Sequence, residues 1–281
     1  MNFWKPVVGL VGLSTFLGAA VAVAGGGGSS DPRDTIGVVR SGVWFLRSSN
    51  DPTCATAQLN TVGFGASTDV PLAMDLDGDG ADQKTVFRDE GGNGTFYVAG
   101  ANTPTGIGAI TVINFGTGTD IPVVGNFDPS DAGDEVGIYR PSTNAFFLDD
   151  GNPSPLSFIF GDPGDIPVVG NWDDSVDGSD EVGVYRPSNN TFYLRDDLNP
   201  STPTVTERPL GATGDLPITG DWDRDGRTTI GVFRDQTFGF YFLVNGATGQ
   251  TVDFAIGLGA GSDTPVASDW DGPSTDEAGC P

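Results

Sequence analysis

A repeat of about 48 residues dominates this chain and constrains its fold more than any other feature. Each copy joins a short apolar run to an acidic loop and then to a second apolar run, as in residues 166–186, IPVVGNWDDSVDGSDEVGVYR. The copies start at Val70, Ile121, Ile166, Leu216 and Thr264, so their spacings are 51, 45, 50 and 48 residues. A repeat of this length indicates one supersecondary unit that buries its core by stacking on its neighbours.

Each of the first four copies continues with two further runs of strand character. A strongly apolar run follows the second strand, and a fourth run ends in a glycine corner before the next copy begins. The apolar runs are residues 95–98, 145–148, 191–194 and 240–243, and the corners are residues 115–116, 160–161, 210–211 and 258–259. Four short strands separated by turn residues are typical of one β-propeller blade.

The two ends of the chain complete the count of blades. The segment from Asp34 supplies strands two to four of a blade, and the copy from Thr264 supplies strand one and its loop. We therefore predict an all-β fold, a five-bladed β-propeller of four-stranded antiparallel blades with one blade closed by both termini, because closure removes exposed strand edges. The alternative is that the split blade closes between neighbouring molecules, which would give a homo-oligomer or an open filament.

Residues 1–24 are predicted to be a signal peptide or an N-terminal membrane anchor. Lys5 precedes the uncharged residues 6–24, and Ala22-Val23-Ala24 fits a cleavage site, but 19 uncharged residues also approach the length of a membrane span. Membrane anchoring through residues 6–24 therefore stays open. Residues 25–30 form a predicted Gly/Ser linker and residues 31–281 the propeller, which we expect to be exported to an extracellular, periplasmic or cell-surface location.

Charge and composition narrow the range of functions. The chain has 38 acidic and 13 basic residues, a net charge of −25 and no histidine. Such charge argues against nucleic acid or an anionic membrane surface as a partner. Without histidine, the Ser-His-Asp and Cys-His catalytic arrangements are absent. The acidic residues recur at equivalent positions, whereas an active site would need carboxylates that break the repeat, so we predict that the chain is not an enzyme.

The sequence contains two cysteines, Cys54 and Cys280, and the predicted strand order places both at the same end of the split blade. In an exported protein they predict one disulfide, which would covalently join the two ends of the chain in the split blade. Two free thiols and an intermolecular bond are the alternatives.

The acidic loops carry the most specific chemistry. Residues 75–80 and 221–226 both follow D-x-D-x-D-G, which places three carboxylates around one point and suits Ca²⁺. At position nine these two loops have Gln83 and Thr229, which would supply an amide or hydroxyl oxygen or leave the place to water. The other three loops retain fewer or displaced ligands, and the alternative for all five is that acidic turns only solvate strand connections. The predicted calcium ligands are Asp75, Asp77, Asp79, Asn126, Asp128, Glu135, Asn171, Asp173, Glu181, Asp221, Asp223, Asp225, Asp269, Asp271 and Glu277.

Other repeated residues indicate structural roles. An arginine and an aspartate each recur once per blade, and we expect Arg–Asp pairs between blades, with ligand contacts as the alternative. Aromatic residues inside the acidic loops are expected to pack between blades, with stacking on sugar rings as the alternative. The arginines are Arg40, Arg88, Arg140, Arg186 and Arg234, the aspartates are Asp69, Asp120, Asp165, Asp215 and Asp263, and the aromatic residues are Phe127, Trp172, Trp222 and Trp270.

These features resemble the FG-GAP or VCBS-type repeats of integrin alpha subunits and many bacterial surface proteins. The resemblance rests on the corners Phe64-Gly65, Phe115-Gly116 and Phe160-Gly161, on the D-x-D-x-D-G loops and on the strand after each loop. It implies a calcium-stabilised propeller used in adhesion or recognition. Integrin propellers have seven blades, so only the calcium loops are carried over to this chain.

The expected function is therefore that of an exported, calcium-binding, non-catalytic structural or adhesive module. Its ligand would be a protein or a glycan at the cell surface. Two alternatives stay open: a carbohydrate-binding lectin with sites between blades, and a subunit of a larger extracellular filament or membrane-anchored assembly.

Overall fold

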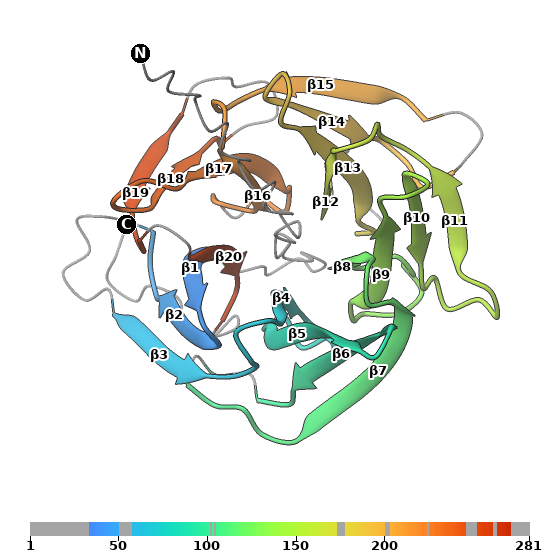
Figure 1. Cartoon of the computed structure of the whole chain (residues 1–281), viewed down its shortest axis with the longest axis horizontal. Coiled ribbons are helices and arrows are strands. Elements are labelled where there is room, and N and C mark those ends of the chain that lie inside the picture. The colour runs from blue at the N-terminus through green and yellow to red at the C-terminus, as the bar shows by residue number, and fades with distance from the viewer. Residues whose placement is uncertain are drawn as a thin grey trace, which may run out of the picture.

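Five sheets arranged around a ring make up the protein. The computed structural model describes residues 34–50, 58–101, 103, 105–172, 178–199, 203–223, 225–245, 252–260 and 263–270. These residues form twenty strands in five four-stranded antiparallel sheets, which surround a central axis (Figure 1). The prediction of a five-bladed β-propeller is confirmed. Within the same residues, no helix has the length and apolar character needed to cross a membrane.

We name the blades A to E in ring order, with strands given from the innermost to the outermost. Blade A is β4 (Val70–Met74), β5 (Gln83–Glu90), β6 (Asn93–Ala99) and β7 (Ile110–Thr117); blade B is β8 (Ile121–Gly125), β9 (Glu135–Arg140), β10 (Ala145–Leu148) and β11 (Leu156–Ile159); blade C is β12 (Ile166–Gly170), β13 (Glu181–Arg186), β14 (Thr191–Arg195) and β15 (Val205–Pro209); blade D is β16 (Leu216–Gly220), β17 (Thr229–Arg234), β18 (Phe240–Leu243) and β19 (Phe254–Gly257); blade E is β20 (Thr264–Ser268), β1 (Thr35–Arg40), β2 (Val43–Arg47) and β3 (Leu59–Gly63).

Blade E joins the two ends of the chain. Strand β20 pairs antiparallel with β1, so that Thr35 lies opposite Ser268 and Val39 lies opposite Thr264. The innermost strands β4, β8, β12, β16 and β20 contact one another in that order around the ring. The split blade is thus completed within one chain, as predicted. Residues 1–30, Cys54 and Cys280 lie outside the described residues, so the predicted leader, linker and disulfide stay predictions.

A glycine in the second strand of four blades lets the strands of a blade pack closely. A Cβ atom on Gly183 would lie 2.7 Å from Leu194 Cδ2 in the next strand, which is closer than two carbon atoms can approach. The same relation holds between Gly137 and Leu148. The glycine therefore makes room for a buried leucine, and the repeat preserves the pair.

Aromatic residues from the acidic loops fill the space between blades. Trp222 of blade D is 1% exposed and packs with Ile36 and Val38 of blade E. Phe127, Trp172 and Trp270 are buried in the equivalent interfaces. Packing between blades is confirmed, and because these rings are covered, stacking of sugars on them is excluded.

The recurring arginines and aspartates do form pairs, but within each blade. Arg140 Nε and Nη2 donate to the two carboxylate oxygens of Asp120 at 2.9 and 2.8 Å. Asp120 immediately precedes β8, and Arg140 ends β9, the neighbouring strand of the same sheet. The prediction of pairs between blades was therefore wrong, because the strand register brings the two ends together inside one sheet. The other pairs are Arg88 with Asp69, Arg186 with Asp165, Arg234 with Asp215 and Arg40 with Asp263.

Candidate metal centre

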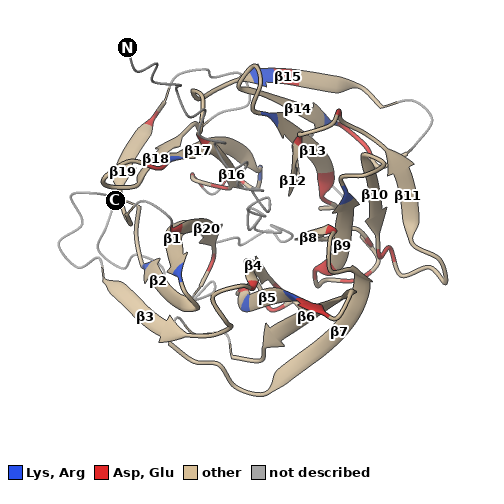
Figure 2. Ribbon diagram, viewed as in Figure 1, with Lys and Arg blue, Asp and Glu red and all other residues tan. Residues whose placement is uncertain are grey.

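The acidic loops connect the first strand of each blade to the second. Because every blade has the same strand order, the loops lie at one end of the ring, and acidic residues recur from blade to blade (Figure 2). Among the described residues, two groups bring three carboxylates together, with oxygen atoms within 4.8 Å of one another. The groups are Asp75, Asp77 and Asp79 in blade A and Asp221, Asp223 and Asp225 in blade D.

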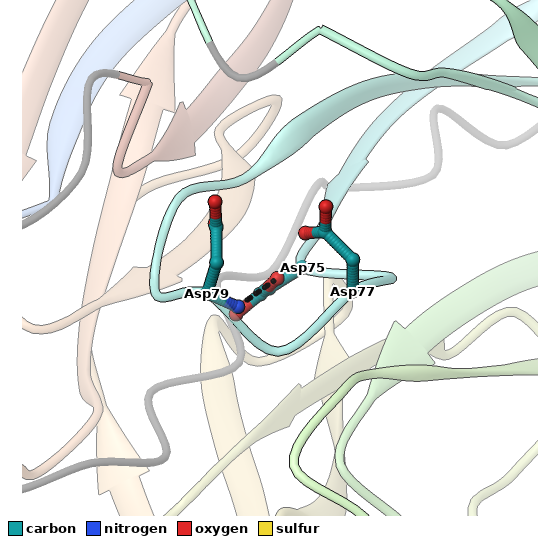
Figure 3. A group of neighbouring side chains, drawn as sticks. All are labelled: Asp75, Asp77 and Asp79. Atoms are coloured by element: carbon teal, nitrogen blue, oxygen red, sulfur yellow. Dashed lines mark hydrogen bonds between the residues drawn. The ribbon is translucent and has the colours of Figure 1, made fainter.

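The loop of blade A is folded around the carboxylate of Asp75. Its Oδ1 accepts hydrogen bonds from the N–H groups of Gly78 at 2.8 Å and Asp79 at 3.2 Å, and its Oδ2 accepts one from Gly80 at 2.8 Å. The carboxylates of Asp77 and Asp79 extend to the same side of this loop (Figure 3). One buried carboxylate thus shapes the turn, and the exposed carboxylates of Asp77 and Asp79 gather beside it.

The loop of blade D repeats this arrangement. Asp221 is buried, its Oδ2 accepts the N–H of Gly226 at 2.9 Å, and its Oδ1 accepts that of Asp223 at 3.2 Å. Gly226 has a φ of 81°, which a residue with a side chain rarely adopts. The D-x-D-x-D-G spacing therefore encodes the same turn in two blades, with three carboxylates gathered in each.

The side chain at position nine makes hydrogen bonds to its own loop. Gln83 Oε1 accepts the N–H of Leu76 at 2.7 Å, and its Nε2 donates to Asp77 Oδ1 at 2.9 Å. Glu135 Oε2 occupies the equivalent place in blade B, where it accepts the N–H groups of Phe127 and Asp128. This side chain fastens the start of its loop, and in blade A it turns a donor rather than an oxygen toward the carboxylates.

The remaining predicted ligands are spread more widely. Asp128 Oδ1 accepts hydrogen bonds from the N–H and hydroxyl of Ser130, which lower the pKa of Asp128. Asn126 Oδ1 and Asn171 Oδ1 are buried without a hydrogen-bond partner. Glu181 Oε2 accepts the N–H of Trp172. Asp269 is buried at the end of β20, while Asp173, Asp271 and Glu277 lie outside the described residues.

Burial makes the ionised form of several loop carboxylates costly. Burial raises the pKa of Asp75, although the hydrogen bonds that its carboxylate accepts from three backbone N–H groups oppose the shift. Burial likewise raises the pKa of Glu135 to about 7, with repulsion from Asp128 and Asp131 adding to the effect. A bound divalent cation would favour the ionised forms of these carboxylates.

A belt of hydrogen bonds joins each acidic loop to the next blade, and sequence reasoning missed it. The first residue of a loop exchanges two bonds with the residue that precedes the second strand of the neighbouring blade. Backbone N–H to carbonyl distances are 2.6–2.9 Å, and side-chain oxygens accept the returning N–H groups at 2.7–3.1 Å. The pairs are Asp75 with Asp134, Asn126 with Asp180, Asn171 with Thr228, Asp221 with Asp34 and Asp269 with Asp82.

The signal for this belt was present in the sequence. Asp or Thr stands directly before the second strand of every blade, but its partner lies in another copy of the repeat. Burial raises the pKa of Asp82 and of Asp134 well above the usual range, and repulsion from neighbouring carboxylates adds to it. The belt therefore concentrates buried acid groups immediately behind the loops.

A charged strand residue in blade A breaks the repeat. Lys84 in β5 is fully buried and occupies the position of Val136, Val182 and Ile230 in other blades. Its Nζ donates to the Thr103 carbonyl at 2.8 Å, and burial lowers the pKa of Lys84 to about 8. Its cross-strand neighbour is Ala73, which is small enough to leave room for it.

The fold and the loops define the class: a five-bladed β-propeller with two gathered acidic turns at one end. No protein-family model matches the chain, and no curated protein matches its sequence.

Proposed function

We propose that this chain is an exported, calcium-binding propeller that serves as a non-catalytic structural or adhesive module of the FG-GAP or VCBS type. The observation that carries the proposal is the gathering of three carboxylates in each of two equivalent loops, Asp75–Asp77–Asp79 and Asp221–Asp223–Asp225. Oxygen-only ligands around a glycine-permitted bend suit Ca²⁺ better than a transition metal.

Calcium would act on the whole ring rather than on one loop. Asp75 and Asp221, which shape the two turns, are also members of the belt that joins neighbouring blades. An ion that stabilises the turn therefore stabilises an interface between blades. This connection supports a structural role for the metal.

Two features support a non-catalytic role. The sequence contains no histidine, and the acidic residues of the loops occupy equivalent positions rather than one distinct cleft. Export is supported by the uncharged segment of residues 6–24, and a surface ligand by the family resemblance.

Calorimetric titration with Ca²⁺ tests the metal proposal. We expect two sites per chain from the loops of blades A and D, each lost separately in Asp77→Asn and Asp223→Asn. Asp131→Asn, which changes an exposed carboxylate outside the two groups, is the matched control and should leave both sites intact. Absence of calcium binding at millimolar concentration would overturn the proposal. Light scattering of the same samples separates a monomeric ring from a subunit that assembles.

A further inference from the structure

Blade A departs from the repeat on its outer strands. Strands β5, β6 and β7 have 8, 7 and 8 residues, whereas those of the other blades have 4 to 6. The hairpin between β5 and β6 is lengthened, and its added residues include Glu90 and Asn93. A feature that one blade alone carries among the described residues is not needed to build the ring, so it calls for another explanation.

The pairing of β6 with β7 is also irregular. Its register shifts between Asn93 and Thr95, and this is the one such shift among the described strand pairs. A Cβ atom on Gly94 would lie 2.5 Å from the Phe115 carbonyl oxygen, so the two strands approach closely at the bulge. A bulge of this kind redirects side chains, and bulges are frequent beside binding sites.

A surface groove of about 570 Å³ lies at this bulge. It is lined mainly by Glu90, Asn93, Thr95, Tyr97, Val112 and Asn114. The Tyr97 hydroxyl donates to Glu90 Oε1 at 2.8 Å, and the Thr95 hydroxyl donates to Asn114 Oδ1 at 3.1 Å. The polar groups are thus held in place before a ligand arrives, and the volume suits a small molecule or a short oligomer.

The groove keeps an acidic charge. Arg88 stacks on the Tyr97 ring, 4.8 Å from its centroid, and lies 3.6 Å from Glu90. The same Arg88 guanidinium donates to both carboxylate oxygens of Asp69 at 2.8 and 2.7 Å, so one arginine faces two carboxylates and the groove stays acidic. The net charge of −25 disfavours an anion. The ligand best suited to the groove therefore carries no negative charge and supplies hydrogen-bond donors to its oxygen atoms.

The lining combines hydrogen-bonding groups with apolar surface. The side chains of Asn93, Asn114 and Glu90 carry oxygen atoms that can accept hydrogen bonds from hydroxyl groups, and Val112, which is 52% exposed, offers an apolar face. A sugar ring presents hydroxyl donors around its edge and C–H groups on its face. We propose that this groove on blade A binds a neutral glycan.

The groove is independent of the candidate metal centre. The acidic loop precedes β5, whereas the hairpin that supplies Glu90 and Asn93 follows it, so the two lie at opposite ends of that strand. The proposal therefore does not rest on calcium binding, and chelation at a temperature well below unfolding should leave glycan binding in place.

An array of neutral and acidic glycans, probed with the whole chain, tests this proposal. Binding is expected to neutral glycans, and the strongest binder is then titrated calorimetrically against variants. Asn114→Ala removes an acceptor and Tyr97→Phe removes the hydroxyl that orients Glu90, so each should weaken affinity at least tenfold. Tyr193→Phe is the matched control, because Tyr193 occupies the equivalent position in blade C, and it should bind as the parent does.

Several outcomes would overturn the proposal. One is that no neutral glycan on the array binds. Another is that Tyr97→Phe and Tyr193→Phe lose affinity equally. The third is that Asn114→Ala leaves the affinity unchanged. Displacement of the bound glycan by an extended peptide would instead assign the groove to a protein ligand. Because the array does not depend on calcium, its result is separate from that of the calcium titration.

Discussion

The carboxylate of Asp134 accepts the backbone N–H of Asp75 on the neighbouring blade at 2.8 Å, and the Asp134 N–H donates to the Asp75 carbonyl at 2.6 Å. This exchange connects the turn that gathers three carboxylates to the second strand of the next blade. Five such exchanges close the ring, since the last one joins Asp269 of blade E to Asp82 of blade A. The acidic loops are therefore parts of the interfaces between blades.

Asp134→Ala is expected to destabilise the ring by about 1–3 kcal/mol, because it leaves the buried N–H of Asp75 without its acceptor. Asp134→Thr should cost less, since Thr228 performs the same role in blade D through its hydroxyl. Urea unfolding of both variants measures the difference. Equal stability of Asp134→Ala and the parent would show that the belt does not contribute.

The stability of the metal-free protein should fall between about pH 4.5 and 7. Burial raises the pKa of Glu135 to about 7 in the folded state, so the folded protein holds a proton that the unfolded chain has released. Stability from this group is present at low pH and is lost as pH rises through 7. Glu135→Gln, which copies Gln83 of blade A, should flatten the pH dependence while keeping the oxygen that the loop needs. Unfolding curves from pH 4.5 to 8 test this, and identical slopes would contradict it.

The Arg140–Asp120 pair of blade B should stabilise the protein at neutral pH and lose this effect in acid. Although burial opposes the change, hydrogen bonds from Arg140 and Thr117 lower the pKa of Asp120. Its stabilisation is therefore present above pH 4 and is lost as pH falls through the lowered pKa. We expect Asp120→Asn to cost roughly 1–3 kcal/mol at pH 7 and progressively less in acid. Glu207→Gln on an exposed strand is the control, and a cost that does not depend on pH would refute the assignment.

Replacing Lys84 by isoleucine, the residue of blade D at this position, should raise stability at pH 7 by on the order of 1 kcal/mol. The gain is expected because burial lowers the pKa of Lys84 to about 8, so at pH 7 the folded state carries a charge that it disfavours. The parent should gain stability from this group between pH 8 and 10.5, and the variant should not. A loss of stability at pH 7 would indicate that the bond to the Thr103 carbonyl outweighs the cost of burial.

The repeat was sufficient to predict the ring, because strand runs such as residues 166–169 recur with one period and the two ends supply complementary strands. It also located the turns, since the glycine of D-x-D-x-D-G determines the bend around Asp75. The spacing of the sequence repeat does not show which copy a given side chain contacts. Arg140 was therefore assigned to the wrong neighbour, and Asp134, whose partner lies 59 residues away, was overlooked. The groove of blade A was missed because it depends on departures from the repeat.

Thermal unfolding with Ca²⁺ and with EDTA tests the central claim most directly. Calcium that binds the folded state and not the unfolded state stabilises the fold by about 2.7 kcal/mol per site when its concentration is one hundred times Kd. We predict a large rise in Tm for the parent, a smaller rise for Asp77→Asn or Asp223→Asn, and none for the double variant. The same Tm with Ca²⁺ and with EDTA for the parent would contradict the assignment of calcium to these loops.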